Sequence, residues 1–356
     1  MADEALLRPI PLSSYIAVGL SVLLMLFSWG LYTALVVYST NVDGTPVPSL
    51  YAAGAFAHAG EVAAAAIARW DGKAWSALAA GVVGTVNAVA AVGDKLYAGG
   101  AFNMTDGAPA NLAAWNGSAW AHAGVADVAT GPVYALAAWG ETLVVGGAFD
   151  GRLGTWDGGV WTPVANAPPG PVHALLDTDS LLYVGGDFAG PLAWDGATWT
   201  MLGSGLNGDI YALAVHSDGA LYAGGALGAG SANPSRWTGS AWEPVGGSVD
   251  GTIYALASTD DGRLCAGGAF SRVAGVAARN VACWDGAAWA ARGDGRDAAV
   301  RSLLYYDKAL VVGGDFAGGV ASVRQCGADP NTWHSYEDGV DGPVYALLTS
   351  TSSWGA

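Results

Sequence analysis

The chain has 356 residues, a formal net charge of −16 at pH 7, 52% hydrophobic residues and only 12% Asp, Glu, Lys and Arg. This apolar content excludes an intrinsically disordered chain. The negative charge argues against a nucleic-acid partner, because the phosphate backbone attracts basic surfaces. The 54 glycines and 16 tryptophans are far above ordinary usage, which points to a specialised architecture.

The first apolar segment runs from Tyr15 to Tyr38 and contains no charged residue. A helix of this length spans roughly 36 Å at about 1.5 Å per residue, enough to cross a bilayer with some tilt. A cleaved signal peptide is the alternative, but its apolar region is shorter, about 7–15 residues. We therefore predict a short N-terminal tail (1–14) and a transmembrane helix (15–38) that acts as a signal anchor in the lipid bilayer.

The charges that flank this segment predict its orientation. Arg8 precedes it, and the next basic residue is Arg69, so the positive-inside rule places the N-terminus in the cytosol. Two sequons make Asn103 and Asn116 candidate glycosylation sites on the other side. We expect a single-pass membrane protein whose main domain is extracellular or lumenal, or lies on the surface of an assembly such as a virion.

After a polar linker (39–49), a sequence motif of the form Leu-Tyr-x-Gly-Gly-x-Phe recurs with a period of roughly 40 residues. Its seven copies begin at Leu50, Leu96, Leu143, Leu182, Leu221, Leu264 and Leu310. Six are preceded by an apolar phrase resembling Val-Tyr-Ala-Leu-Ala, which begins at Val86, Val133, Val172, Ile210, Ile253 and Val300. Six are followed by paired tryptophans around an Asp-Gly, Asn-Gly or Thr-Gly turn; the seventh is altered, from Cys326.

Each repeat thus contains four short extended segments, and Asp-Gly and Asn-Gly are strong hairpin signals. Four antiparallel strands per repeat predict an all-β fold, a seven-bladed β-propeller of four-stranded blades over residues 50–356. The chain enters and leaves the repeats in mid-unit. Residues 344–349 should therefore form the innermost strand of a split blade with residues 50–80, which closes the ring. We interpret the small residues as sites of close backbone approach and nearly every Trp as core packing.

The repeat sequence "DKLYAGGAF…LAAWNGSAW" resembles the Kelch repeat, in which a strand ends in Gly-Gly and an aromatic pair follows later. It is also similar to repeats of fungal cortical polarity-marker proteins, which are membrane-anchored surface proteins. The resemblance covers residues 50–356 and implies a propeller. The galactose-oxidase group shares this fold and uses copper, but we cannot place its ligand set on this chain. Propellers host binding modules and enzymes alike, so the resemblance implies no catalytic residue.

No catalytic, cofactor or metal site emerges from the residues themselves. The five histidines (His58, His122, His173, His216 and His334) show no metal-ligand spacing. His173 occupies a slot that is Tyr in other repeats, and we interpret it as a packing variant. The turn aspartates Asp71, Asp157, Asp195 and Asp285 are explained by the preference of Asp for tight turns. Cys265 and Cys283 form either a disulfide across one hairpin or two buried thiols.

Two classes of function remain. The first is a membrane-anchored, non-enzymatic interaction or structural module whose propeller face binds another protein or a glycan, in adhesion or in a larger assembly. The alternative is a secreted or lumenal propeller enzyme, galactose-oxidase-like or glycan-active. An enzyme needs titratable groups that converge at the mouth of the central channel, and the sequence shows no such group. The first class is therefore our expectation, with no cofactor.

Carbonate extraction tests the predicted anchor. We expect the full-length chain to stay in the membrane pellet, because the charge-free segment 15–38 buries its side chains in lipid. A variant lacking residues 1–38 is the matched control and should be released. Release of the full-length chain into the soluble fraction would contradict the prediction.

Overall fold

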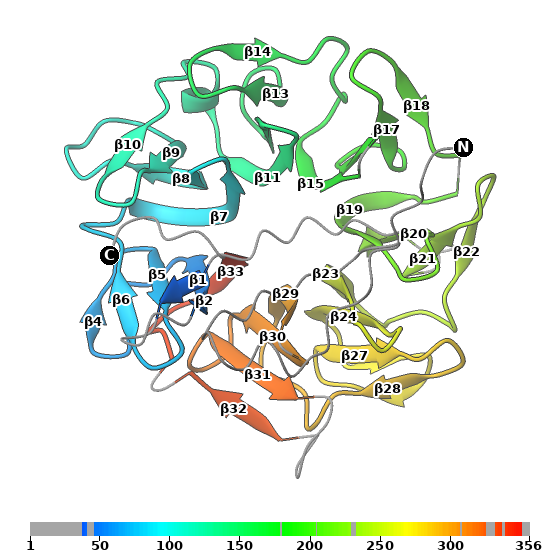
Figure 1. The fold of residues 1–356 in the computed structure, drawn as a ribbon. Coiled ribbons are helices and arrows are strands. Elements are labelled where there is room, and N and C mark those ends of the chain that lie inside the picture. Colours follow the sequence, from blue (N-terminus) through cyan, green and yellow to red (C-terminus); the bar gives the residue numbers. More distant parts are fainter. Residues whose placement is uncertain are drawn as a thin grey trace, which may run out of the picture. The chain divides into compact units, whose positions relative to one another are not determined.

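Seven antiparallel sheets, each one blade of a β-propeller, make up most of the described structure (Figure 1). Each blade has four strands, and in one of them the short strand β1 (Tyr38–Thr40) extends the sheet to five. The computed structural model describes residues 38–40, 46–178, 180–203, 205–228, 233–306, 308–324, 332–336 and 339–350, all of which lie in one compact unit, Tyr32–Ala356. The fold of this unit confirms the predicted seven-bladed, all-β architecture.

The blades are numbered from the one that contains β2, and their strands are listed from the innermost to the outermost. Blade 1 contains β33 (Val344–Ser350), β2 (Pro46–Gly54), β5 (Ile67–Trp70) and β6 (Trp75–Ala77). Blade 2 contains β7 (Val83–Val92), β8 (Lys95–Asn103), β9 (Leu112–Trp115) and β10 (Trp120–His122). Blade 3 contains β11 (Val133–Trp139), β12 (Thr142–Gly147), β13 (Leu153–Trp156) and β14 (Trp161–Pro163). Blade 4 contains β15 (Val172–Asp177), β16 (Leu182–Gly186), β17 (Leu192–Trp194) and β18 (Trp199–Met201).

The remaining blades follow the same order. Blade 5 contains β19 (Gly208–Val215), β20 (Leu221–Leu227), β21 (Ser235–Trp237) and β22 (Trp242–Pro244). Blade 6 contains β23 (Thr252–Ser258), β24 (Leu264–Ala269), β27 (Val281–Trp284) and β28 (Trp289–Ala291). Blade 7 contains β29 (Val300–Tyr306), β30 (Ala309–Gly314), β31 (Val320–Arg324) and β32 (Trp333–Ser335). Shorter elements are β1 (Tyr38–Thr40), the hairpins β3 (His58–Ala59) with β4 (Val62–Ala63) and β25 (Arg272–Val273) with β26 (Val276–Ala277), and the 3-10 helix η2 (Val128–Thr130).

Strand β33 closes the ring. It pairs antiparallel with β2, so that Leu50 lies opposite Thr349 and Ala53 opposite Ala346. Figure 1 shows it beside the blue N-terminal strands. Each inner strand also contacts the next one around the ring, and β33 contacts both β29 and β7. The predicted split blade is therefore confirmed, and it joins two distant parts of the chain.

The double glycine in the second strand of each of blades 2 to 7 permits two close contacts. A Cβ on the first glycine would meet the next blade, as between Gly146 and Val172 Cγ1 at 2.6 Å. A Cβ on the second would overlap a backbone carbonyl of its own inner strand, as between Gly186 and Pro171. The repeated pair therefore permits packing between blades and within each blade.

The paired tryptophans lie opposite each other across the outer hairpin, as Trp115 does to Trp120. In six blades the indole of the second Trp donates a hydrogen bond back toward the preceding blade, for example from Trp242 Nε1 to the Leu202 carbonyl at 2.6 Å. All 12 paired tryptophans are buried or half-buried, which agrees with the predicted packing role. Trp120 donates in the same way to Leu78, at 3.0 Å. The second Trp therefore joins neighbouring blades at their outer edge.

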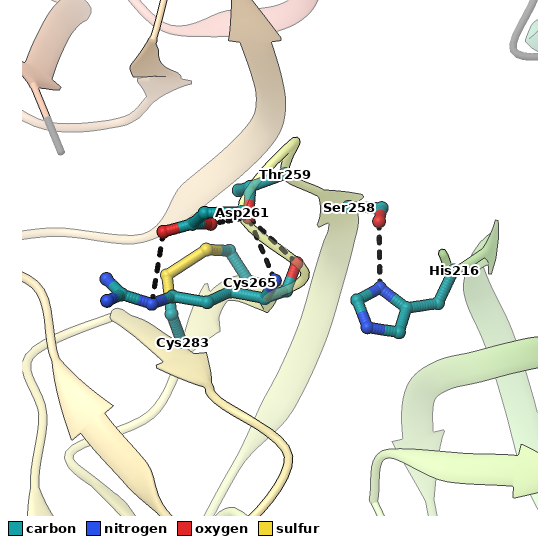
Figure 2. Close-up of a disulfide and its surroundings, with 7 residues drawn as sticks. His216, Ser258, Thr259, Asp261, Cys265 and Cys283 are labelled. Atoms are coloured by element: carbon teal, nitrogen blue, oxygen red, sulfur yellow. Dashed lines mark hydrogen bonds and ion pairs between the residues drawn. A yellow bond between two sulfur atoms is a disulfide. The ribbon is translucent and has the colours of Figure 1, made fainter. Parts of the chain in front are cut away.

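Three further expectations concern the N-terminus and the cysteines. Residues 15–37 of the predicted transmembrane helix lie outside the described residues, and the described part of the chain contains no helix long and apolar enough to span a bilayer. Strand β2 begins at Pro46, four residues before the expected boundary at Leu50, because residues 46–48 pair with β1. Cys265 and Cys283 form a disulfide between β24 and β27, which decides between the two alternatives (Figure 2).

A chain that ends at Gly342 should lose several kcal/mol of stability, because it lacks the buried inner strand of blade 1. Val344 in this strand is fully buried. A chain that ends at Ser350 keeps β33 whole and is the matched control. We expect thermal melting to show a large decrease only for the first truncation; equal melting temperatures would contradict the role of β33 in closure.

Candidate functional site

The inner strand of every blade contains a β-bulge near its start. In blade 3 Val133 pairs with Gly147 and Ala135 with Gly146, so that Tyr134 is left without a partner in the ladder. The same shift recurs in the other six blades. Bulges redirect side chains, often beside functional sites. We call the seven bulge residues the collar: Asn87, Tyr134, His173, Tyr211, Tyr254, Arg301 and Tyr345.

From Tyr134 to Tyr345, the collar residues contact one another in blade order. The Tyr134 ring stacks on His173 with centroids 4.7 Å apart, and His173 meets Tyr211 edge-on at 5.1 Å. The Tyr211 and Tyr254 rings are 5.8 Å apart. The guanidinium of Arg301 lies 4.3 Å from the centre of the Tyr254 ring. All seven collar residues are half-buried.

Three carboxylates accompany the collar. Asp187 Oδ1 lies 2.9 Å from His173 Nε2. Asp315 Oδ2 accepts from Arg301 Nη2 at 2.7 Å and from Nε at 3.0 Å. Asp209 Oδ2 accepts a hydrogen bond from the Tyr211 hydroxyl at 3.1 Å. Titratable groups that the sequence left scattered therefore converge here.

Two of these groups have shifted pKa values. Burial, followed by the charge of Asp209 and its hydrogen bond, raises the pKa of Tyr211 to about 12. Burial lowers the pKa of Arg301, but the hydrogen bond and charge of Asp315 outweigh it, so that the pKa lies above its ordinary value. The tyrosine therefore stays protonated and the arginine stays charged at physiological pH.

A cavity of about 230 Å³ lies on the axis of the ring, since residues from all seven inner strands line it. Its lining includes Asn87, His173, Tyr211, Tyr254 and Arg301 of the collar. The collar lies near the start of each inner strand. In an antiparallel blade this is the face that carries the connections between the second and third strands.

These connections differ between blades, unlike the turns on the opposite face. They are short in three blades (148–152, 187–191 and 315–319) and longer in the others (55–66, 104–111, 228–234 and 270–280), where two carry extra hairpins. On the opposite face, six blades carry the same turn, with a positive-φ glycine between its paired tryptophans. Sequence variety is therefore concentrated on the collar face, as is common for binding loops.

One sequence signal for this site was missed. Only blades 4 and 7 carry Asp after the double glycine, at Asp187 and Asp315, where the other five carry Ala. The same two blades have His or Arg, rather than Tyr or Asn, as the collar residue. His173 does pack in the tyrosine slot, as interpreted, but it also pairs with a carboxylate. Comparing the two phrases blade by blade would have shown this pairing.

The turn aspartates have the structural role that their position predicted. Asp157 Oδ1 accepts hydrogen bonds from the backbone amides of Val160 and Gly159, at 2.7 and 2.9 Å. These bonds lower its pKa. Asp71, Asp195 and Asp285 do the same in their turns. They hold the turns closed.

The remaining candidates lie apart from the collar. Both sequon residues, Asn103 and Asn116, are exposed, and the Oδ1 of Asn116 accepts amides of its own turn. His216 Nδ1 contacts the Ser258 hydroxyl at 2.8 Å near the disulfide (Figure 2). His58 pairs with Asp341 at 2.8 Å on an exposed loop. Within the described ranges, no group of three or more His, Cys, Asp or Glu is placed to hold a metal.

Comparison with known proteins supports the fold alone. Neither a scan against protein-family models nor a search of the curated proteins finds a match. Among solved structures, the chain is similar to the computationally designed Ika8 protein, with a TM-score of 0.53 and 20% identity over 86% of this chain and 94% of that one. It is also similar to YCF48 bound to D1 peptide, with a TM-score of 0.54 and 16% identity over 76% and 94%.

Replacing Asp209 by Asn should lower the pKa of Tyr211 from about 12 toward the ordinary tyrosine value near 10. In the folded wild type Tyr211 keeps its proton after the unfolded chain has lost it. Its contribution to stability is therefore complete below about pH 10 and lost as pH rises toward about 12. In Asp209→Asn the loss of stability as pH rises toward about 12 should be smaller.

NMR titration with ¹³Cζ-labelled tyrosine would measure the shift. Tyr222, whose hydroxyl contacts Asp218, is the internal control and should titrate identically in both proteins. An unchanged Tyr211 midpoint would show that Asp209 does not act on it.

Proposed function

We propose that this chain is a membrane-anchored, non-enzymatic binding module. In this proposal residues 15–38 hold it in a bilayer, Kelch-like repeats build its ring, and the collar face binds another protein, extracellularly or in the lumen. The observation that carries the proposal is the collar, in which seven bulges direct one residue per blade to the same mouth.

Two further observations support a protein partner. The long connections surround the same mouth and differ between blades, so they present an individual surface on a repeated frame. Aromatic and arginine residues, which the collar concentrates, are enriched where proteins bind one another. The similar propeller of YCF48 is described as bound to a D1 peptide, and the analogy with it is one of fold only.

Photo-crosslinking through the collar tests this proposal. In the full-length chain, in membranes of cells that make it, p-benzoylphenylalanine replaces Tyr134 or Tyr345. The control position is Val160, which is 62% exposed in a turn of the opposite face. We expect one protein to crosslink from the collar positions and not from Val160. Crosslinking from Val160 alone, or from no position, would overturn the proposal, and a crosslinked glycan would change the class of partner.

A second candidate function is a glycan-active enzyme, secreted or lumenal. One observation favours it: His173 and Asp187 pair beside an accessible cavity, as a general acid or base requires. The double variant His173→Gln and Asp187→Asn separates the candidates. An enzyme should lose hydrolysis of glycan substrates in this variant, whereas wild-type protein that hydrolyses none of them would rule the candidate out.

A further inference from the structure

We infer that the collar binds a cationic side chain, an arginine or lysine, that a partner polypeptide inserts along the axis of the ring. This inference rests on the proposed function and names the chemistry of its ligand. It follows from the charge balance of the collar, from a guanidinium that the collar already holds, and from the size of the cavity.

The collar carries more negative than positive charge. Arg301 is balanced by Asp315, which accepts hydrogen bonds from its Nε and Nη2 atoms. Asp187 faces His173, and Asp209 is contacted only by the Tyr211 hydroxyl among the described groups. Neither Asp187 nor Asp209 has an arginine or lysine partner among the described residues, so two carboxylates beside the mouth lack a permanent counter-charge. The chain as a whole carries −16 and attracts cations over longer distances.

Arg301 shows how the collar accommodates a guanidinium. Its Cζ lies 4.3 Å from the Tyr254 ring centre and 6.0 Å from that of Tyr345, while Asp315 supplies the carboxylate. Such cation–π contacts are favourable because the ring faces are electron-rich. A permanent cation, two aromatic rings and a carboxylate thus form one sector of the collar.

The sector formed by Tyr134, His173 and Tyr211 contains the same kinds of group without a permanent cation. Its rings are stacked or edge-on, and Asp187 and Asp209 provide its carboxylates. The charges of both aspartates contribute to the raised pKa of Tyr211. This sector is therefore the part of the collar best suited to a second, incoming cation.

The size of the cavity on the ring axis limits what can enter it. At about 230 Å³ the cavity is smaller than the roughly 300–1000 Å³ of small-molecule sites. One side chain fits it better than a whole cofactor.

The test uses the full-length chain in detergent micelles with ¹³C-labelled histidine. The probes are acetyl-Gly-Arg-Gly-amide, its uncharged isostere with citrulline, and acetyl-Gly-Glu-Gly-amide. His173 is the reporter, assigned by the loss of its peak in His173→Gln. The other four histidines lie outside the collar and act as internal controls.

We expect the arginine probe alone to shift the His173 peak saturably and to leave the others in place. In Asp209→Asn its affinity should decrease about fivefold, as for loss of one part-exposed charge contact. Asp106→Asn removes the same charge from an exposed outer loop and should bind as wild type does. Unchanged positions of the four control peaks would show that each variant remains folded.

An equal response to citrulline, a response to the glutamate probe, or equal shifts of all five histidines would overturn the inference. The crosslinking experiment has a separate outcome. A partner that crosslinks at the collar while the arginine probe fails would leave the proposed function intact and refute this ligand class. Arginine binding without collar crosslinking would support this ligand class and refute the proposed function.

Discussion

The structure depends on the close approach that the double glycines permit. In each of blades 2 to 7 the first glycine lies against the Val or Ile that begins the next inner strand, and the second lies against the backbone of its own inner strand. Blade 1 has Ala53 in the first position, in the same hydrophobic cluster as Val86. Any larger side chain at these places would separate blades or strands.

The same contact creates the collar. The second glycine faces the point where the inner strand bulges, so the carbonyl that precedes the bulge can come close. The bulge then turns one residue per blade out of the ladder. A requirement of packing thus supplies seven equivalent positions around one mouth, and their side chains are free to vary without disturbing the ring. In this chain they became aromatic, basic or amide residues.

The two faces of the propeller differ in how much they vary. The turns between paired tryptophans repeat nearly unchanged, because the Asp or Asn side chain closes the turn and the Trp rings pack beneath it. The collar face carries connections of different length and, in blades 4 and 7, a carboxylate matched to a basic collar residue. The residues that stabilise the blades therefore lie at one end of the strands, and the residues that we propose for recognition lie at the other.

The sequence by itself determined the number of blades, the order of strands within them and the closure by residues 344–349. These features depend on local residue patterns and on a repeat period that recurs along the chain. The collar needed the tertiary structure. Tyr134, His173 and Tyr211 lie in three different repeats, and only the closed ring brings them to one axis. The bulge that redirects them is a shift of pairing register, which no side-chain pattern records. The disulfide was likewise left open, because the spacing of Cys265 and Cys283 permits a bond and only the strand register places the two cysteines opposite each other.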